Sequence, residues 1–238
     1  MSGRGFLAAA ASLCLLAVIG GCEDEPDEFA LVGGTDWALL PFDREVSFAV
    51  DSVVYDPAVG GTDRDSSRSL WHVSPLDSSE IERVHEYAAT RDGRRLGGGV
   101  WSWTRVQRQT VHTLDGISLV GLIAPFSPGT VWDPLVYADP STVLDVAGEP
   151  VVPFKRWAGR IDSVGTYVMP DDTPIEAVWV TLADDENLLE LREFYEIYGA
   201  GEGLLERHVR ILDTQNTNSQ LSWAEKAERG FEVHLKRL

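Results

Sequence analysis

Residues 100–123 read VWSWTRVQRQTVHTLDGISLVGLI and carry the clearest structural signal in the chain. Both halves of the stretch are rich in Val, Ile, Leu, Thr and Trp, which favour β-strands. Between them, Asp115-Gly116 tolerates the positive φ angles of a type I′ turn, whose twist matches two antiparallel strands. A two-residue loop also sets the register, so we expect a hairpin in which Leu114 faces Ile117.

Other segments share this strand-like pattern. In 46–55, apolar residues alternate with Ser and Ala as in a half-buried strand, and Asp92-Gly93 is a second, weaker hairpin signal. We expect a polar loop over 60–69 and a strand that ends at Pro75, because proline lacks the N–H that a ladder needs. Further strands are predicted over 69–73, 178–182, 204–212 and 231–238.

Two stretches fit a helix and a strand equally well by pattern alone. Residues 77–90 offer Asp77 and Glu80 as a capping box, followed by apolar residues at helical spacing. Residues 184–198 offer an acidic cap and an apolar face, with Gly199 as a stop. The choice between helix and strand stays open at this point.

Composition limits the class of protein. The chain has 238 residues, 44% of them hydrophobic, which is enough apolar material for a sizeable core. The formal net charge is -18 at pH 7, so the folded surface repels nucleic acid, and we expect no nucleic-acid partner. We predict a mostly β structure, a curved antiparallel sheet or partly open barrel, as a single domain over 37–238.

The amino-terminal segment has the pattern of a lipoprotein signal. An apolar run too short to span a membrane ends in Ile19-Gly20-Gly21-Cys22, which resembles the bacterial lipobox of aliphatic, small, small, Cys. The resemblance implies that 1–21 is a signal peptide and that Cys22 carries a diacylglyceryl group and an acyl chain such as palmitate. The expected partner is therefore a membrane, reached through covalent lipid on Cys22, and the expected location is the cell envelope, at the outer membrane.

The residues after the lipobox separate the domain from this anchor. Residues 22–36 contain a run of acidic side chains that repel one another, with Pro26 and two glycines that discourage regular structure. We therefore predict a flexible acidic tether. Cys14 lies in the removed segment and Cys22 is consumed by lipid, so no disulfide is expected in the mature monomer.

Three short motifs also resemble a group of uncharacterised lipoproteins from the Bacteroidetes group. They are 50–56 (VDSVVYD), 184–198, which begins DDEN and ends YEIY, and 201–205 (GEGLL). The chain departs from that group at 44–46, where Arg-Glu-Val replaces the usual Gly-x-x-Trp entry. The resemblance implies an antiparallel β domain without an assigned activity, and with it we predict strands over 80–90 and 186–198.

Candidate chemistry is sparse. The five histidines are scattered without an HxH or HxxxH pair, and no GxSxG elbow is present, so we predict no catalytic residue, no metal site and no cofactor. Trp101-Ser102-Trp103 places two indoles on the same face of one strand. If exposed, they are a platform for a sugar or lipid ligand; if buried, they are core side chains.

Three classes of function remain. The first is a non-catalytic envelope lipoprotein that acts as a scaffold or surface-interaction module with an envelope protein partner. The second is a carrier or sensor of a hydrophobic ligand held in the concavity of the sheet, and the third is a hydrolase without a recognisable motif. A deep apolar pocket favours the second class, and an exposed aromatic patch on a filled sheet favours the first.

Overall fold

The computed structural model describes residues 39–56 and 64–238 of the chain. They form a 12-stranded antiparallel sheet that is nearly closed into a barrel, and a separate two-stranded hairpin. The expectation of a mostly β fold with a curved sheet or partly open barrel is confirmed. The lipobox residues Ile19, Gly20, Gly21 and Cys22, the signal peptide over 1–21 and the tether over 22–36 lie outside the described residues.

The elements follow one another along the chain with mostly short connections. They are β1 (Val46–Tyr55), β2 (Arg64–Ser78), β3 (Glu82–Arg91), β4 (Arg94–Val106), β5 (Gln109–Leu114), β6 (Ile117–Ile123), β7 (Val131–Trp132), β8 (Leu144–Val146), β9 (Glu149–Val151), β10 (Gly159–Val168), β11 (Pro174–Glu186), β12 (Glu190–Gly199), β13 (Gly203–Asp213), α2 (Trp223–Lys226) and β14 (Arg229–Arg237).

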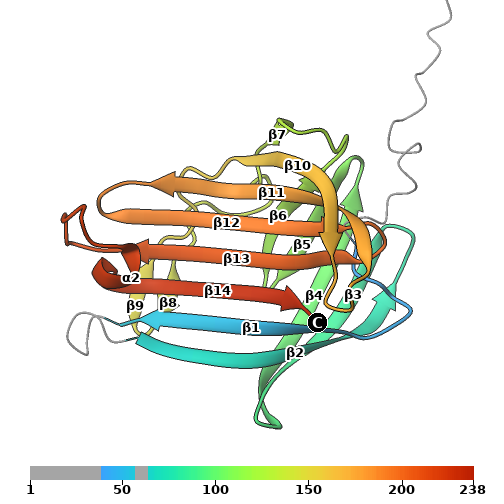
Figure 1. Ribbon diagram of the computed structural model, residues 1–238, viewed down its shortest axis with the longest axis horizontal. Helices are drawn as coiled ribbons and strands as arrows, with labels where there is room; N and C mark the ends of the chain where they lie inside the picture. Colours follow the sequence, from blue (N-terminus) through green and yellow to red (C-terminus); the bar gives the residue numbers. More distant parts are fainter. Residues whose placement is uncertain (1–38, 57–63) are drawn as a thin grey trace, which may run out of the picture.

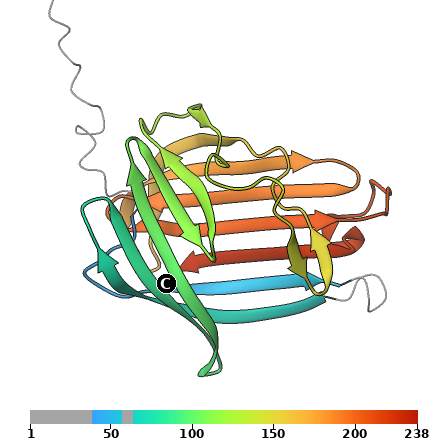
Figure 2. The same cartoon turned by 180° about the vertical axis from the view of Figure 1, so that it is seen from behind.

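The large sheet is a meander whose first and last strands are joined. Its strand order is β6-β5-β4-β3-β2-β1-β14-β13-β12-β11-β10-β7, and β8 pairs with β9 in the small hairpin. The antiparallel pairing of β1 with β14 links the amino-terminal half of the meander to the carboxy-terminal half. Figures 1 and 2 show β1, β2 and β11–β14 side by side, with β3–β6 crossing over one face of them at a steep angle.

Trp132 holds the two edges of the sheet, β6 and β7, close together. Its indole Nε1 donates to the carbonyl of Val120 at 2.8 Å, and the Val120 N–H donates to the carbonyl of Pro134 at 2.9 Å. The indole covers Gly159 of β10, where a Cβ would lie 2.4 Å from the ring. These contacts between β6 and the β7 region make a seam in place of a continuous ladder, which is why the barrel is nearly closed.

The strand predictions are largely confirmed. Leu114 pairs with Ile117 across the Asp115-Gly116 turn, and both turn residues have positive φ, 51° and 81°. The two ambiguous stretches are strands, because 80–90 contains most of β3 and 186–198 contains most of β12.

Two local predictions about β2 are wrong. The expected loop over 60–69 overlaps the strand, which begins at Arg64, and the strand continues beyond Pro75 to Ser78. A register shift between Pro75 and Asp77 accommodates the missing proline N–H. Polar cross-strand contacts stabilise the polar part of β2 on β1, such as Ser67 Oγ on Ser52 Oγ at 2.8 Å.

One part of the barrel interior is filled by aromatic side chains. Trp101 and Trp103 of β4 are fully buried with ring centroids 4.2 Å apart, because strand alternation points both to the inner face. Leu39 and Leu40 belong to the same buried cluster, and their segment is held to β3, where His85 Nε2 donates to the carbonyl of Pro41 at 2.9 Å and Arg83 Nη1 donates to that of Leu40 at 2.8 Å. The two indoles are therefore core side chains and offer no exposed platform.

The hairpin turn gives a direct test of the fold. We expect Gly116→Val to lower the free energy of unfolding by about 1–3 kcal/mol, because a β-branched residue is strained at positive φ. Urea unfolding followed by tryptophan fluorescence measures the change. Ser118→Val, in the adjacent strand rather than the turn, is the control and should change stability less; an equal loss in both variants contradicts the turn assignment.

Candidate functional site

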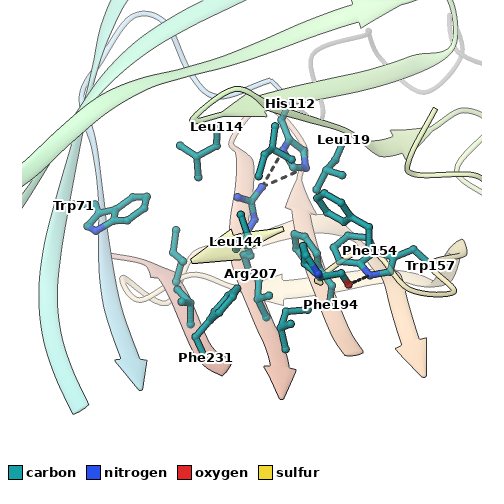
Figure 3. A pocket seen from close by; sticks show the side chains of 16 residues that line it. Trp71, His112, Leu114, Leu119, Leu144, Phe154, Trp157, Phe194, Arg207 and Phe231 are labelled. Atoms are coloured by element: carbon teal, nitrogen blue, oxygen red, sulfur yellow. Dashed lines mark hydrogen bonds between the residues drawn. The ribbon is translucent and has the colours of Figure 1, made fainter. Parts of the chain in front are cut away.

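The interior also contains an apolar cavity of about 250 Å³ beside the aromatic cluster (Figure 3). All but two of its lining side chains are apolar, and the two polar ones are His112 and Arg207. The full lining is Trp71, His112, Leu114, Ile117, Leu119, Leu144, Pro153, Phe154, Trp157, Phe194, Arg207, Val209, Ile211, Phe231, Val233 and Leu235.

Strand alternation builds two walls of the cavity. On β13, Arg207, Val209 and Ile211 are successive inward positions, and Phe231, Val233 and Leu235 do the same on β14. The opposite wall comes from β5 and β6 and includes His112, Leu114 and Leu119 (Figure 3). The cavity therefore lies between the two crossing parts of the same sheet.

The segment that precedes β10 covers one side of the cavity. Trp157 packs edge-on against both Phe154 and Phe194, with ring centroids 5.2 and 5.1 Å apart, and its Nε1 donates to the carbonyl of Pro153 at 2.9 Å. Arg192 Nε fixes the same segment by donating to the carbonyl of Val152 at 3.2 Å. The β8–β9 hairpin, which supplies Leu144, lies beside this segment and contacts β14 (Figure 2).

An ion pair forms the polar end of the cavity. Arg207 and Glu196 are direct cross-strand neighbours on β13 and β12. The Glu196 Oε1 atom accepts from Arg207 Nε at 2.8 Å and from Nη2 at 2.6 Å, and both residues are buried. The guanidinium also lies over the ring of Trp101, 4.8 Å from its centroid, so it connects the aromatic cluster to the cavity.

Two further side chains complete this polar cluster. Tyr198 donates its hydroxyl to Glu196 Oε2 at 2.6 Å, and Arg207 Nη2 lies 3.3 Å from both ring nitrogens of His112. Gly121 makes room for them, because a Cβ there would lie 2.3 Å from the Tyr198 oxygen and 2.8 Å from His112 Cδ2. Any larger residue at this position would disrupt the cluster.

The protonation states follow from burial and charge. Burial alone would raise the pKa of Glu196, but the positive charge of Arg207, with help from His112 and Tyr198, lowers it to about 2. Burial lowers the pKa of His112, Glu196 opposes this effect, and Arg207 adds to it. Burial and the Glu196 charge raise the pKa of Tyr198 well above its usual value. At neutral pH the cluster is therefore one neutralised ion pair with a neutral imidazole and a neutral phenol.

Histidines also meet on the outer face of the sheet. His208 and His234 are cross-strand neighbours on β13 and β14 with ring centroids 5.5 Å apart, and His234 Nε2 lies 2.7 Å from Glu206 Oε1. Within the described ranges, no group of three or more His, Cys, Asp or Glu side chains is placed to hold a metal ion. Across the same residues, no helix has the length and apolar character needed to span a membrane.

Comparison with known proteins finds no family model, no curated protein and no solved structure that matches this chain.

The sequence prediction did not include the cluster. Trp101, one of the two residues it singled out, contacts Arg207 but does not line the cavity, and Trp103 lies further from it among the core side chains. The missed residues, Glu196 and Arg207, carry opposite charges in two adjacent predicted strands. Opposite charges in neighbouring strands can indicate a cross-strand ion pair. To use this signal, one needs the register of β12 on β13, which does not follow from the sequence alone.

The cluster makes stability depend on pH. We expect Glu196→Gln to lower the free energy of unfolding by about 3–5 kcal/mol at neutral pH, because it leaves Arg207 buried without a counter-charge. A carboxylate with a lowered pKa stabilises the fold above its unfolded pKa and loses that effect as pH falls toward the folded value of about 2. The difference between the two proteins should therefore shrink as pH falls below about 4.

Urea unfolding at a series of pH values measures this difference. Glu193→Gln is the matched control, since Glu193 also lies on β12 and accepts from an arginine, Arg210, at 2.8 Å, but on the partly exposed outer face. Glu193→Gln should lower the free energy of unfolding by at most about 1 kcal/mol. A Glu196→Gln effect no larger than that of the control contradicts the buried ion pair.

Proposed function

We propose that this protein is a non-catalytic carrier or sensor of a hydrophobic ligand, which binds in the apolar cavity between β13–β14 and β5–β6. The observation that carries the proposal is the lining of the cavity: every lining side chain except His112 and Arg207 is apolar. Concave, mostly apolar sites with a few convergent polar groups are the usual form of small-molecule sites.

The burial of the lining supports the same reading. Trp71, Leu114, Val209, Phe231 and Val233 are only partly buried, although they point to the inside of the barrel. Apolar side chains in a filled core reach full burial, as Trp101 and Trp103 do. A ligand in the cavity would remove the remaining apolar surface from water, at roughly 25 cal/mol per Å².

The size of the cavity limits the ligand. At about 250 Å³ it lies just below the ~300–1,000 Å³ range of typical ligand sites, so it suits a single hydrocarbon chain or a small ring system. The polar cluster favours binding over turnover, because Arg207, Glu196 and Tyr198 are engaged with one another. The carrier proposal thus takes precedence over the scaffold and hydrolase alternatives.

The amino-terminal sequence suggests where such a carrier works. We propose, from the lipobox resemblance, that Cys22 carries acyl chains that hold the domain at a membrane of the cell envelope. Two or three chains would make a durable anchor, since each buried CH2 contributes about 0.8 kcal/mol. The domain would then sit close to a source of apolar ligands.

A cavity-filling variant tests ligand binding. We expect Val209→Trp to weaken binding of N-phenyl-1-naphthylamine, a neutral apolar fluorophore, by about tenfold or more, because the indole occupies the ligand volume. Fluorescence titration measures the affinity. Lys236→Trp, which adds the same side chain on the exposed outer face of β14, should leave it unchanged. The proposal is contradicted if the unaltered protein does not bind the fluorophore, or if all three proteins bind it equally well.

The anchor has a separate test. We expect Cys22→Ser to leave the precursor unacylated and uncleaved at residue 21, because the hydroxyl does not accept the diacylglyceryl group in place of the thiol. Mass spectrometry of the amino terminus from expressing cells decides the question. An unmodified mature peptide that begins elsewhere in the unaltered protein contradicts the lipoprotein assignment.

A further inference from the structure

The polar end of the cavity has an unused hydrogen-bond donor. Arg207 bonds to Glu196 through Nε and Nη2 and approaches His112 through Nη2, whereas its Nη1 donates to no atom of the described residues. In Figure 3, this free arm of the guanidinium points to the side of the cavity on which Trp71 and Leu114 lie. Arg207 is only 5% exposed and lines the cavity, so a ligand in the cavity would cover this donor.

We propose that the ligand is a neutral single-chain amphiphile, such as a long-chain alcohol or ester, whose oxygen accepts a hydrogen bond from Arg207 Nη1. The inference rests on the proposed carrier function and names the class of ligand that the cavity selects. A ligand that covers this donor without offering an acceptor leaves it unpaired in the complex, so an oxygen acceptor at this point stabilises the complex more than an alkyl terminus does.

Charge decides between a neutral and an anionic head group. The positive charge of Arg207 is already balanced by Glu196, whose Oε1 lies 2.6 Å from Nη2. A carboxylate at Nη1 would place a second negative charge close to Glu196 among apolar walls, where repulsion is weakly screened. His112, the other polar side chain in the lining, stays neutral because burial lowers its pKa. The pair therefore offers a hydrogen bond without an unpaired positive charge.

The exterior of the protein reinforces this selection. The formal net charge of the chain is -18 at pH 7, so the molecule as a whole repels anionic ligands and slows their approach. A neutral amphiphile meets no such barrier.

The geometry also places the hydrocarbon chain. Val209 and Ile211 are the next two inward positions after Arg207 on β13, and Val233 and Phe231 lie beside them on β14. These side chains form the apolar floor of the cavity. At about 3.3 Å per residue, the distance along β13 from Arg207 to Ile211 is roughly 13 Å. One chain laid along the floor therefore has its head at Arg207 and its tail near Phe231.

The experiment compares four probes with the same hydrocarbon chain: methyl laurate, lauryl alcohol, laurate and dodecane. Each displaces bound N-phenyl-1-naphthylamine from the unaltered protein and from Arg207→Lys, near neutral pH. Lysine keeps the positive charge beside Glu196 but removes the second guanidinium arm. Arg210→Lys is the matched control, because Arg210 lies on the same strand and pairs with Glu193 on the outer face.

We expect Arg207→Lys to weaken the binding of methyl laurate and of lauryl alcohol about tenfold, because one hydrogen bond from a charged donor is lost. The affinity for dodecane should not change. Arg210→Lys should leave all four affinities unchanged. We also expect the unaltered protein to bind methyl laurate more tightly than laurate, a result that needs no variant and holds if Arg207→Lys does not fold.

Two outcomes overturn the inference while the carrier function stands. Tighter binding of laurate than of methyl laurate means that the site selects an anionic head group. If Arg207→Lys weakens the binding of methyl laurate and of dodecane equally, Arg207 does not contact the head group. If neither the fluorophore nor any probe binds the unaltered protein, the carrier function itself fails.

Discussion

A guanidinium inside an apolar barrel has to be neutralised, and the Arg207–Glu196 ion pair that does so constrains the rest of the interior. Because the two residues are cross-strand neighbours, the pair exists in only one register of β12 on β13. A slip of one residue would turn Glu196 to the outer face and leave the guanidinium buried alone. The ion pair thus specifies the register at the centre of the sheet, and Tyr198, two residues further along β12 on the same face, donates a hydrogen bond to the second carboxylate oxygen.

The ion pair also divides the interior into two unlike parts. On one side Trp101 and Trp103 fill the space together with Leu39 and Leu40. On the other side the inward residues of β13 and β14 change to smaller aliphatic side chains such as Val209 and Val233, and a cavity remains. A seam formed by Trp132, in place of a full ladder, joins β6 to β7, the two outermost strands of the sheet.

The fold was more predictable than the site, for a local reason. The Asp115-Gly116 turn depends on the φ preferences of two adjacent residues, and therefore its hairpin and register followed from the sequence. Residues 186–198 were ambiguous because each face of β12 carries apolar or aromatic residues: Phe194 and Tyr198 point inward, while Tyr195 and Ile197 lie in an outer-face depression with Trp179. A strand with apolar residues on both faces loses the alternation that marks it.

The same alternation rule concealed the site residues. Charged residues in an amphipathic strand are expected on the solvent side, so Glu196 and Arg207 were not candidates for the interior. Only the full pairing of the sheet shows that both point inward and neutralise each other. The sequence therefore supported the choice of a curved antiparallel sheet, but the polar end of its cavity depends on contacts between residues that are distant in the chain, such as His112 and Arg207.

A buried ion pair is weak evidence of a purely structural role, because well-packed apolar residues of similar volume are often at least as stabilising. What the pair adds here is a donor that is held in place before any ligand arrives. Glu196 and Trp101 orient the guanidinium, so a ligand oxygen meets Nη1 without first ordering a flexible side chain. The neutralised charge and the fixed geometry together explain how an apolar cavity in a strongly acidic protein could discriminate by head group as well as by chain.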